Sequence, residues 1–583
     1  MAVSVERLPI DRSLLNPMFE GYKLSFDEIG TDDAKTLSGV LGVKLPDDLF
    51  SYQHTAAFSS HNALTLDQWY PDNVYYVNRD LEFIGCRSRD QEINRSHNAR
   101  KVAQIPRPKE THDRPRSNIC LNFISPQLAV ISDGFGKLLL AATSNRQNVV
   151  EEDNQWRLDQ VNGYACPDTC VIVHASTWKR GDESVIEVIV VRVASDEKAE
   201  KSDTKDTERF RTTLEWLTIG SIKDGNSSWS VERTRTLEGK RAPYYAAITN
   251  NGQAISICAT QAFRFMSDSV VPVVASDGVA SELPDYTWTQ TAENVIVHLS
   301  SPFEVQKSDV SFELSGSSIT MGVTNGRMFF QGELGGEVDV GQSSWTVTNN
   351  MVEIVLNKNT TESWKEVIKG DERGKEISGD EDFAQRVTSE DLVGSGDLDT
   401  FNTDQLEECD TSSEEVALWI RVDGNSHLIT HKVDVSGNEN VFGPVVLDAD
   451  QPACLCLRHN VDGLLFQPVE PKNSEEHIIV QHVHTFDALG YVMASKRDKK
   501  FASCPPNASF AALCDNERNI FIYRSDVSVD STLKNRKSGK IIKKVAKQHI
   551  VSLKEPGPIL GFAVNDSHVF VLKSDILFTI KLK

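Results

Sequence analysis

Tyr286-Thr-Trp-Thr-Gln290 opens a stretch with a strong β-strand pattern, and Ser363-Trp-Lys-Glu-Val367 closes it. Between them, apolar and polar residues alternate in short runs. A period of two places all the apolar side chains of a run on one face of an extended strand. The runs are Val295, Val297, Leu299; Val310, Phe312, Leu314; Ile319, Met321, Val323; Met328, Phe330, Leu334; Trp345, Val347; and Val352, Ile354, Leu356. Turn residues such as Gly316 and Gly335-Gly336 separate them. The stretch therefore predicts a small antiparallel β-sandwich of seven strands.

Four marks in this stretch follow one another in a fixed order: Tyr286-x-Trp288-x-Gln290, Gly332-x-Leu334, Ser344-Trp345 and Trp364. In this order they resemble the CS domain of the NudC family, which has the α-crystallin-like co-chaperone fold. The resemblance implies a domain without a catalytic centre that binds other proteins through a face. We expect Trp288 and Trp345 in the core or at its rim, because a domain of about 85 residues needs large aromatic area to offset its chain entropy.

The composition is that of an ordinary globular protein. The chain has 583 residues, enough for two to four domains, with 39% hydrophobic and 25% charged residues. No run of about 18 apolar residues occurs, so no membrane span is predicted. The N-terminus has no apolar signal core. Ten cysteines are too sparse for a disulfide scaffold, which indicates a reducing compartment, the cytoplasm or the nucleus.

The negative charge is concentrated in one segment. The net charge is −23, and residues 371–415 hold 16 Asp and Glu against 3 Lys and Arg. We interpret 371–415 as an acidic linker, with one helix expected around residues 380–392. Residues 195–209 form a second charged run, expected as a loop between strands. So acidic a chain disfavours direct binding to nucleic acid by the whole surface.

The sequence on both sides of the sandwich repeats one local unit, a strand, a tight turn rich in Asp, Asn or Gly, and a second strand. Turns at 460–463, 515–518 and 565–567 recur at intervals of roughly 50 residues, as in β-propeller blades. Neither flank is long enough for a ring by itself. We therefore predict an all-β protein with one propeller of about seven blades, eight being the alternative. It is formed by residues 1–283 and 416–583, with the sandwich, residues 284–370, inserted between two blades. Two unrelated β-domains remain the other interpretation.

The resemblance to the NudC family extends from about Phe19 to the C-terminus. The stretches that carry it are Thr213–Ile219, Pro243–Ile248, Leu406–Asp410, Cys456–Gly463, Thr485–Tyr491 and Ala494–Phe501. It implies a soluble cytoplasmic and nuclear protein that selects client proteins as a partner of the heat-shock protein 90 chaperone. Family members are also linked to dynein and to clients with propeller folds. The chain lacks the N-terminal coiled coil of NudC itself, so we expect a monomer.

Patterns that carry catalytic or cofactor chemistry are not found in the sequence. There is no Gly-rich nucleotide loop, no GxSxG and no HExxH, so we expect no enzyme and no cofactor. Cys166-x-x-x-Cys170 has no second pair of zinc-ligand spacing, and His482-x-His484 supplies two ligands at most. Asp397-x-Asp399 resembles a calcium loop, which fails at Phe401. We expect no metal site.

One charge cluster suggests a partner-binding patch: Lys496, Arg497, Lys499 and Lys500. The segment Lys534–Lys547 adds seven Lys and Arg. A solvated loop is the plain interpretation. The functional one is a docking patch for an acidic client or for the acidic linker. The sequence thus favours a non-enzymatic co-chaperone or adaptor. The alternative is a scaffold of an RNA- or nucleoprotein-associated complex that uses the basic loops.

Overall fold

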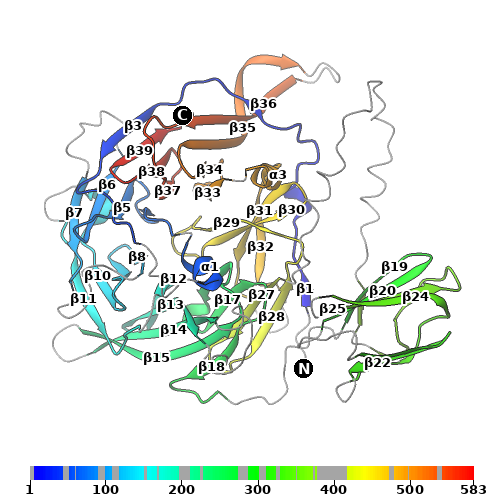
Figure 1. Cartoon of the computed structure of the whole chain (residues 1–583). Helices are drawn as coiled ribbons and strands as arrows, with labels where there is room; N and C mark the ends of the chain where they lie inside the picture. Colours follow the sequence, from blue (N-terminus) through cyan, green and yellow to red (C-terminus); the bar gives the residue numbers. More distant parts are fainter. Residues whose placement is uncertain are drawn as a thin grey trace. The chain divides into compact units, whose positions relative to one another are not determined.

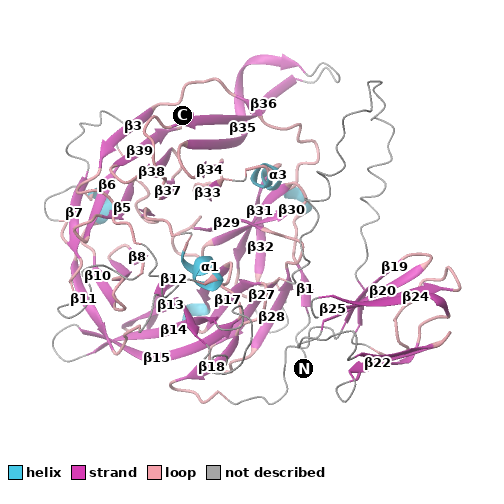
Figure 2. Cartoon of the chain, in the orientation of Figure 1, coloured by secondary structure: helices cyan, strands magenta, loops and turns pink. Residues whose placement is uncertain are grey.

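The structure is a computed structural model of the whole chain, and strands dominate it (Figure 2). It describes residues 5–43, 51–59, 61–88, 99–107, 117–149, 154–166, 170–195, 210–222, 228–273, 286–300, 310–323, 328–348, 351–371, 374–376, 417–471, 478–496, 498–534 and 541–582. The chain forms two compact units. One comprises Val3–Val274 with Ser412–Lys583, and the other comprises Ala275–Thr411.

The first unit is a ring of seven blades (Figure 1). Blades 1 and 2 consist of β4 (Thr65–Leu66), β5 (Asn73–Val77), β6 (Glu82–Arg87) and β7 (Ala99–Gln104), then β8 (Cys120–Ser125), β9 (Leu128–Ser132), β10 (Leu138–Ala142) and β11 (Arg157–Asn162). Blade 3 consists of β12 (Cys170–Arg180), β13 (Glu183–Ser195), β14 (Phe210–Ile222) and β15 (Ser228–Gly239). Blade 4 consists of β16 (Tyr245–Thr249), β17 (Ala254–Ala259), β27 (Leu418–Asp423) and β28 (Ile429–Asp434).

The C-terminal part of the chain supplies the other three blades. Blade 5 consists of β29 (Asn440–Val445), β30 (Cys454–His459), β31 (Asp462–Pro468) and β32 (Val480–Phe486). Blade 6 consists of β33 (Lys499–Ser503), β34 (Ala511–Asp515), β35 (Asn519–Lys534) and β36 (Ile541–Ser552). Blade 7 consists of β37 (Gly561–Val564), β38 (His568–Leu572), β39 (Ile576–Lys581) and β3 (Thr31–Lys35).

The ring closes through both strand pairing and apolar packing. Strand β3 pairs antiparallel with β39, so the N-terminal segment completes the last blade. Each pair of neighbouring blades shares one buried apolar cluster, and the cluster between blades 7 and 1 joins Phe570 and Leu572 to Val74 and Ile84. Closure removes the open sheet edge that an incomplete ring would expose. The predicted all-β fold with a propeller of about seven blades, built from both ends of the chain, is confirmed.

The place of the insertion differs from the prediction. It lies within blade 4 and not between two blades, because Ala259 of β17 pairs with Leu418 of β27 across it. After β17 the chain adds β18 (Arg264–Asp268) to the outer strand β15 of blade 3. The Asp268 carboxylate accepts hydrogen bonds from the guanidinium of Arg233 and contacts His427 Nε2 at 2.8 Å. The departing segment is therefore fixed to blades 3 and 4.

The remaining described elements are short. Strand β1 (Val5–Arg7) pairs in parallel with β28, and β2 (Lys23–Leu24) pairs in parallel with β36. The helices are α1 (Tyr52–Phe58), α3 (Leu489–Ala494) and the 3-10 turns η1 (Arg12–Leu14), η3 (Arg146–Asn148) and η6 (Asn250–Gly252). Among the residues that the structure describes, no helix is long and apolar enough to span a membrane.

The second unit is a β-sandwich. One sheet has the order β24 (Val338–Thr348), β25 (Met351–Lys358), β20 (Asn294–Ser300), β19 (Tyr286–Gln290) and β26 (Gly374–Glu376). The other sheet contains β21 (Val310–Leu314), β22 (Ser318–Val323) and β23 (Met328–Glu333). The alternation read from the sequence is confirmed, since Val295, Val297 and Leu299 are all buried in the core. Strand β26 lies in the segment expected to be linker, and residues 377–416, with the expected helix at 380–392, lie outside the described residues.

Candidate interaction surfaces

The sandwich presents aromatic side chains at the rim of its core. Trp288 is fully buried, while Phe312 and Trp345 are half-buried with ring centroids 5.4 Å apart. Val340 on β24 is exposed. The expectation for the two tryptophans thus holds, with Trp288 in the core and Trp345 at its rim. Partly exposed aromatic area of this kind is typical of protein-contacting surfaces.

A polar corner, formed by Gln290, Lys358, Trp364 and Glu376, lies at the end of β19. The Gln290 side-chain oxygen accepts hydrogen bonds from Lys358 Nζ and the Trp364 backbone N–H, both at 2.8 Å. The Gln290 amide nitrogen donates to the Trp364 carbonyl at 2.8 Å and to Glu376 Oε1 at 2.6 Å. Burial lowers the pKa of Lys358, and the charge of Glu376 acts in the opposite direction. Two donors thus fix the orientation of the Gln290 amide, whose nitrogen bonds the carboxylate.

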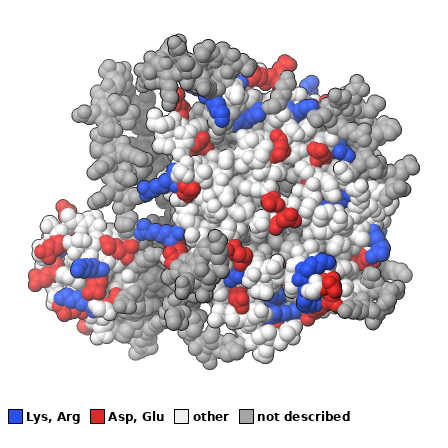
Figure 3. Space-filling model, turned by 180° about the vertical axis from the view of Figure 1, so that it is seen from behind, with Lys and Arg blue, Asp and Glu red and all other residues white. Residues whose placement is uncertain are grey.

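Acidic residues outnumber basic ones in the sandwich. Residues 284–370 include 11 Asp and Glu against 5 Lys and Arg. On the face shown in Figure 3, acidic and basic side chains of the propeller are scattered among one another. The described residues on this face of the propeller therefore do not form one large positively charged surface of the kind that binds nucleic acid.

Several side chains of the predicted basic patch make contacts within the propeller. Lys500 Nζ donates to the carbonyl of Ile559 at 2.6 Å, and burial lowers the pKa of Lys500. Lys496 Nζ lies 4.7 Å from the ring centroid of Phe521, a cation–π geometry. Lys499 is exposed, and its Nζ donates to the carbonyl of Met493 at 3.2 Å.

Part of each basic cluster lies outside the described residues: Arg497 in the first and residues 535–540 in the second. Among the four candidate residues, Lys500 holds β33 to the segment before β37, whereas Lys496 and Lys499 border the surface. Sequence spacing alone does not separate these two roles.

Exposed apolar side chains next to the basic patch were missed from the sequence. Tyr491 on α3 and Val461 in the β30–β31 turn are 65% and 52% exposed, and the Tyr491 N–H donates to the Val461 carbonyl. We call Val461, Tyr491, Lys496 and Lys499 the α3 surface. Its mixture of aromatic, aliphatic and cationic groups suits contact with a protein better than contact with a phosphate backbone.

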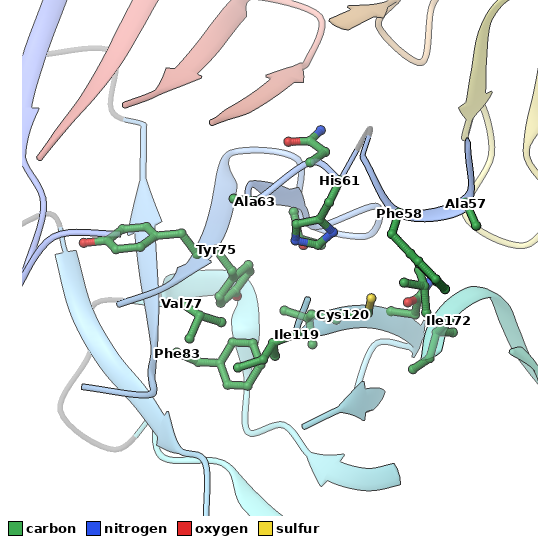
Figure 4. A pocket seen from close by; sticks show the side chains of 16 residues that line it. Ala57, Phe58, His61, Ala63, Tyr75, Val77, Phe83, Ile119, Cys120 and Ile172 are labelled. Atoms are coloured by element: carbon green, nitrogen blue, oxygen red, sulfur yellow. The ribbon is translucent and has the colours of Figure 1, made fainter. Parts of the chain in front are cut away.

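Helix α1 lies near the centre of the ring in Figure 1, and its last residues, Ala57 and Phe58, line a cavity of about 260 Å³. Gln53 donates to the Lys240 carbonyl at 2.7 Å, and so fixes the helix to the blade 3–4 connection. Figure 4 shows the cavity lined by Phe58, His61 and side chains of β5, β6, β8 and β12, such as Tyr75, Phe83 and Ile172. Burial lowers the pKa of His61 to about 4, so the ring is neutral at physiological pH. Ligand pockets more often span about 300–1,000 Å³.

Of the histidine and cysteine pairs, His482, Cys166 and Cys170 are buried in the propeller, while His484 is half-buried. His482 Nδ1 accepts from the Asp11 backbone N–H at 3.2 Å, which fixes the N-terminal segment to blade 5. Cys166 and Cys170 are both buried. Within the described ranges, no three His, Cys, Asp or Glu side chains are grouped so as to hold a metal ion. The residues of the rejected calcium loop lie outside those ranges.

Comparisons with known proteins agree with this geometry. The CS domain family matches residues 284–358. NudC domain-containing protein 1 of Mus musculus is 32% identical over 590 residues, covering 99% of this chain and 98% of that protein. The Xenopus tropicalis protein of the same name is 32% identical over 593 residues, with the same coverage. This chain belongs to the NudC domain-containing protein 1 family.

Membership of the NudC domain-containing protein 1 family covers the propeller as well as the sandwich. Among solved structures, the nuclear movement protein from E. cuniculi GB-M1 is 25% identical, with 14% of this chain and 98% of that chain covered at a TM-score of 0.13. The β-propeller domain of Myceliophteria_thermophila Cps50 (Swd1) is 7% identical, with 95% and 100% covered at a TM-score of 0.31.

Proposed function

We propose that this protein is a non-enzymatic co-chaperone or adaptor that binds client proteins in cooperation with the heat-shock protein 90 system. The observation that carries the proposal is the CS domain, matched over residues 284–358, whose described strands form a sandwich with a buried apolar core. Family membership over nearly the whole chain supports it. We further propose that the protein acts as a monomer in the cytoplasm and the nucleus.

The protein offers one surface for the chaperone and another for the client. The sandwich offers Phe312, Trp345 and Val340, and the propeller offers the α3 surface on a ring fixed by seven shared cores. A rigid platform binds without a large loss of conformational freedom, so more of the contact energy appears as affinity. We propose that the chaperone binds the sandwich and that the client binds the α3 surface of the propeller.

Affinity purification of the full chain, followed by mass spectrometry, tests this function. The comparison variant replaces residues 275–411, the second compact unit, with a Gly/Ser linker. Heat-shock protein 90 should be lost from the variant, while clients bound by the propeller should remain. Equal recovery of the chaperone with both chains would refute the proposal.

The nucleoprotein alternative predicts a different result. If the basic loops bind RNA, filter binding should weaken steeply between 50 and about 200 mM salt, because counterions are released on binding. The bonds from Lys500 to Ile559 and from Lys496 to Phe521 leave fewer cations for such a role. Charge reversal at Lys496 and Lys499 should instead reduce client recovery.

A further inference from the structure

The outer edge of β19 is covered by a segment that the matched CS domain does not include. The match ends at residue 358, and strand β26 consists of Gly374–Glu376. Strand β26 pairs in parallel with β19, with Tyr286 opposite Gly374 and Trp288 opposite Glu376. Without β26, the N–H and C=O groups along this edge of β19 would be open to a partner strand.

Strand β26, which covers this edge, is short. Strand β26 has only three residues, Gly374 contributes no side chain, and Glu376 is exposed. Its described contacts with the domain include the backbone pairing, the packing of Gly374 against the Tyr286 ring, the Gln290–Glu376 hydrogen bond and the charge interaction of Glu376 with Lys358. Backbone hydrogen bonds to a sheet edge are available to any extended peptide. A competing strand can therefore replace β26 without opening the apolar core.

Two positions of the edge select the sequence of the occupant. A Cβ atom at Gly374 would lie 2.2 Å from Cε2 of the buried Tyr286 ring, so this position accepts only glycine. Two residues later, the oriented Gln290 amide bonds a carboxylate at 2.6 Å. Tyr286 and Gln290, two marks of the CS pattern, thus form the ends of a short recognition site.

We propose that the β19 edge is a docking site for extended peptide segments with the pattern Gly-x-Glu, and that Gly374–Glu376 occupies it in cis. The inference rests on the proposed function in that a client supplies the segment that competes with β26. A tethered occupant has an effective concentration in the millimolar range. The cis segment therefore makes the site selective for clients that bind strongly or that also contact the propeller.

A labelled peptide with the sequence of residues 371–379 is the probe, titrated by fluorescence anisotropy against the full chain. The Gly374→Ala variant should release β26 through the collision with Tyr286. It should bind the peptide at least about tenfold more tightly than the wild type does. Gly316→Ala is the matched control, because a Cβ there meets only ordinary contact at 3.8 Å. It should bind as the wild type does.

Peptide variants and hydrogen exchange complete the test. A peptide with alanine in place of Gly374, or glutamine in place of Glu376, should bind the Gly374→Ala chain more weakly than the unchanged peptide does. Amide exchange in β19 should speed up in Gly374→Ala and slow again with the peptide, which also shows that the sandwich is folded. No peptide binding to a folded Gly374→Ala chain would overturn the proposal. If the full chain recovers no heat-shock protein 90 while the Gly374→Ala variant binds the peptide, only the proposed function is refuted.

Discussion

Because the ring is closed, a core substitution between the last and the first blade should destabilise the N-terminal and the C-terminal blades together. Phe570 of β38 is 1% exposed and packs in the cluster shared by blades 7 and 1. Replacing a buried Phe with Ala costs about 3–5 kcal/mol, from lost transfer energy and the cavity that remains. With a urea m value of about 3 kcal/mol/M, the propeller transition should shift by roughly 1–1.7 M.

Hydrogen exchange by region, together with urea unfolding, measures this effect. Phe570→Ala should raise exchange in β5 and β6 of blade 1 as well as in β37 and β38 of blade 7. The sandwich should be unaffected, because it is a separate compact unit. Phe26→Ala is the control, since Phe26 is 90% exposed and its removal should change little. If Phe570→Ala weakens residues 417–582 and leaves residues 5–273 unchanged, the ring is not one cooperative unit.

Three further predictions concern stability. Lys500→Met should lower the free energy of unfolding by about 1–2 kcal/mol, because the bond to Ile559 is lost. Lys499→Met should cost less in the same urea assay, because Lys499 is exposed and its bond to the Met493 carbonyl is longer, at 3.2 Å; equal effects would refute the distinction. Burial lowers the pKa of His174 to about 4, below its unfolded value of about 6.5. Because the unfolded chain then binds a proton that the folded chain does not, the free energy of unfolding should fall progressively as the pH falls from about 6.5 toward about 4. His174→Gln should flatten that part of the pH profile measured by thermal unfolding, and an unchanged profile would contradict the assignment. Replacing 275–411 with a linker of about 30 residues should leave the melting temperature of the propeller unchanged, and a loss of cooperative melting would show that the ring needs the insert.

Local patterns explain the parts of the fold that sequence reasoning predicted. Alternating apolar residues mark a sheet with one buried face, and Val295, Val297 and Leu299 form such a face. Turns such as Asn460 to Gly463 contain the residues that tight turns require, so the hairpins of blades 5 to 7 could be placed. These signals lie within one element or between two adjacent elements.

The features that depend on distant contacts could not be predicted. Strand β3 is the sequence Thr31-Asp-Asp-Ala-Lys35, polar and mostly exposed, and only its pairing with β39 shows that it closes the ring. The insertion appeared to lie between blades because nothing local reveals that Ala259 pairs with Leu418. In the candidate patch, Lys500 bonds a carbonyl 59 residues away, so its structural role is invisible in a run of basic residues.

Direct titration of purified heat-shock protein 90 into the purified protein tests the proposal that its CS domain binds this chaperone. Isothermal titration calorimetry should detect binding to the full chain and none to the chain in which a linker replaces residues 275–411. Circular dichroism and unfolding should show that the propeller of the shortened chain is intact. Equal heats of binding for the two chains, or no binding to the full chain, would contradict the account.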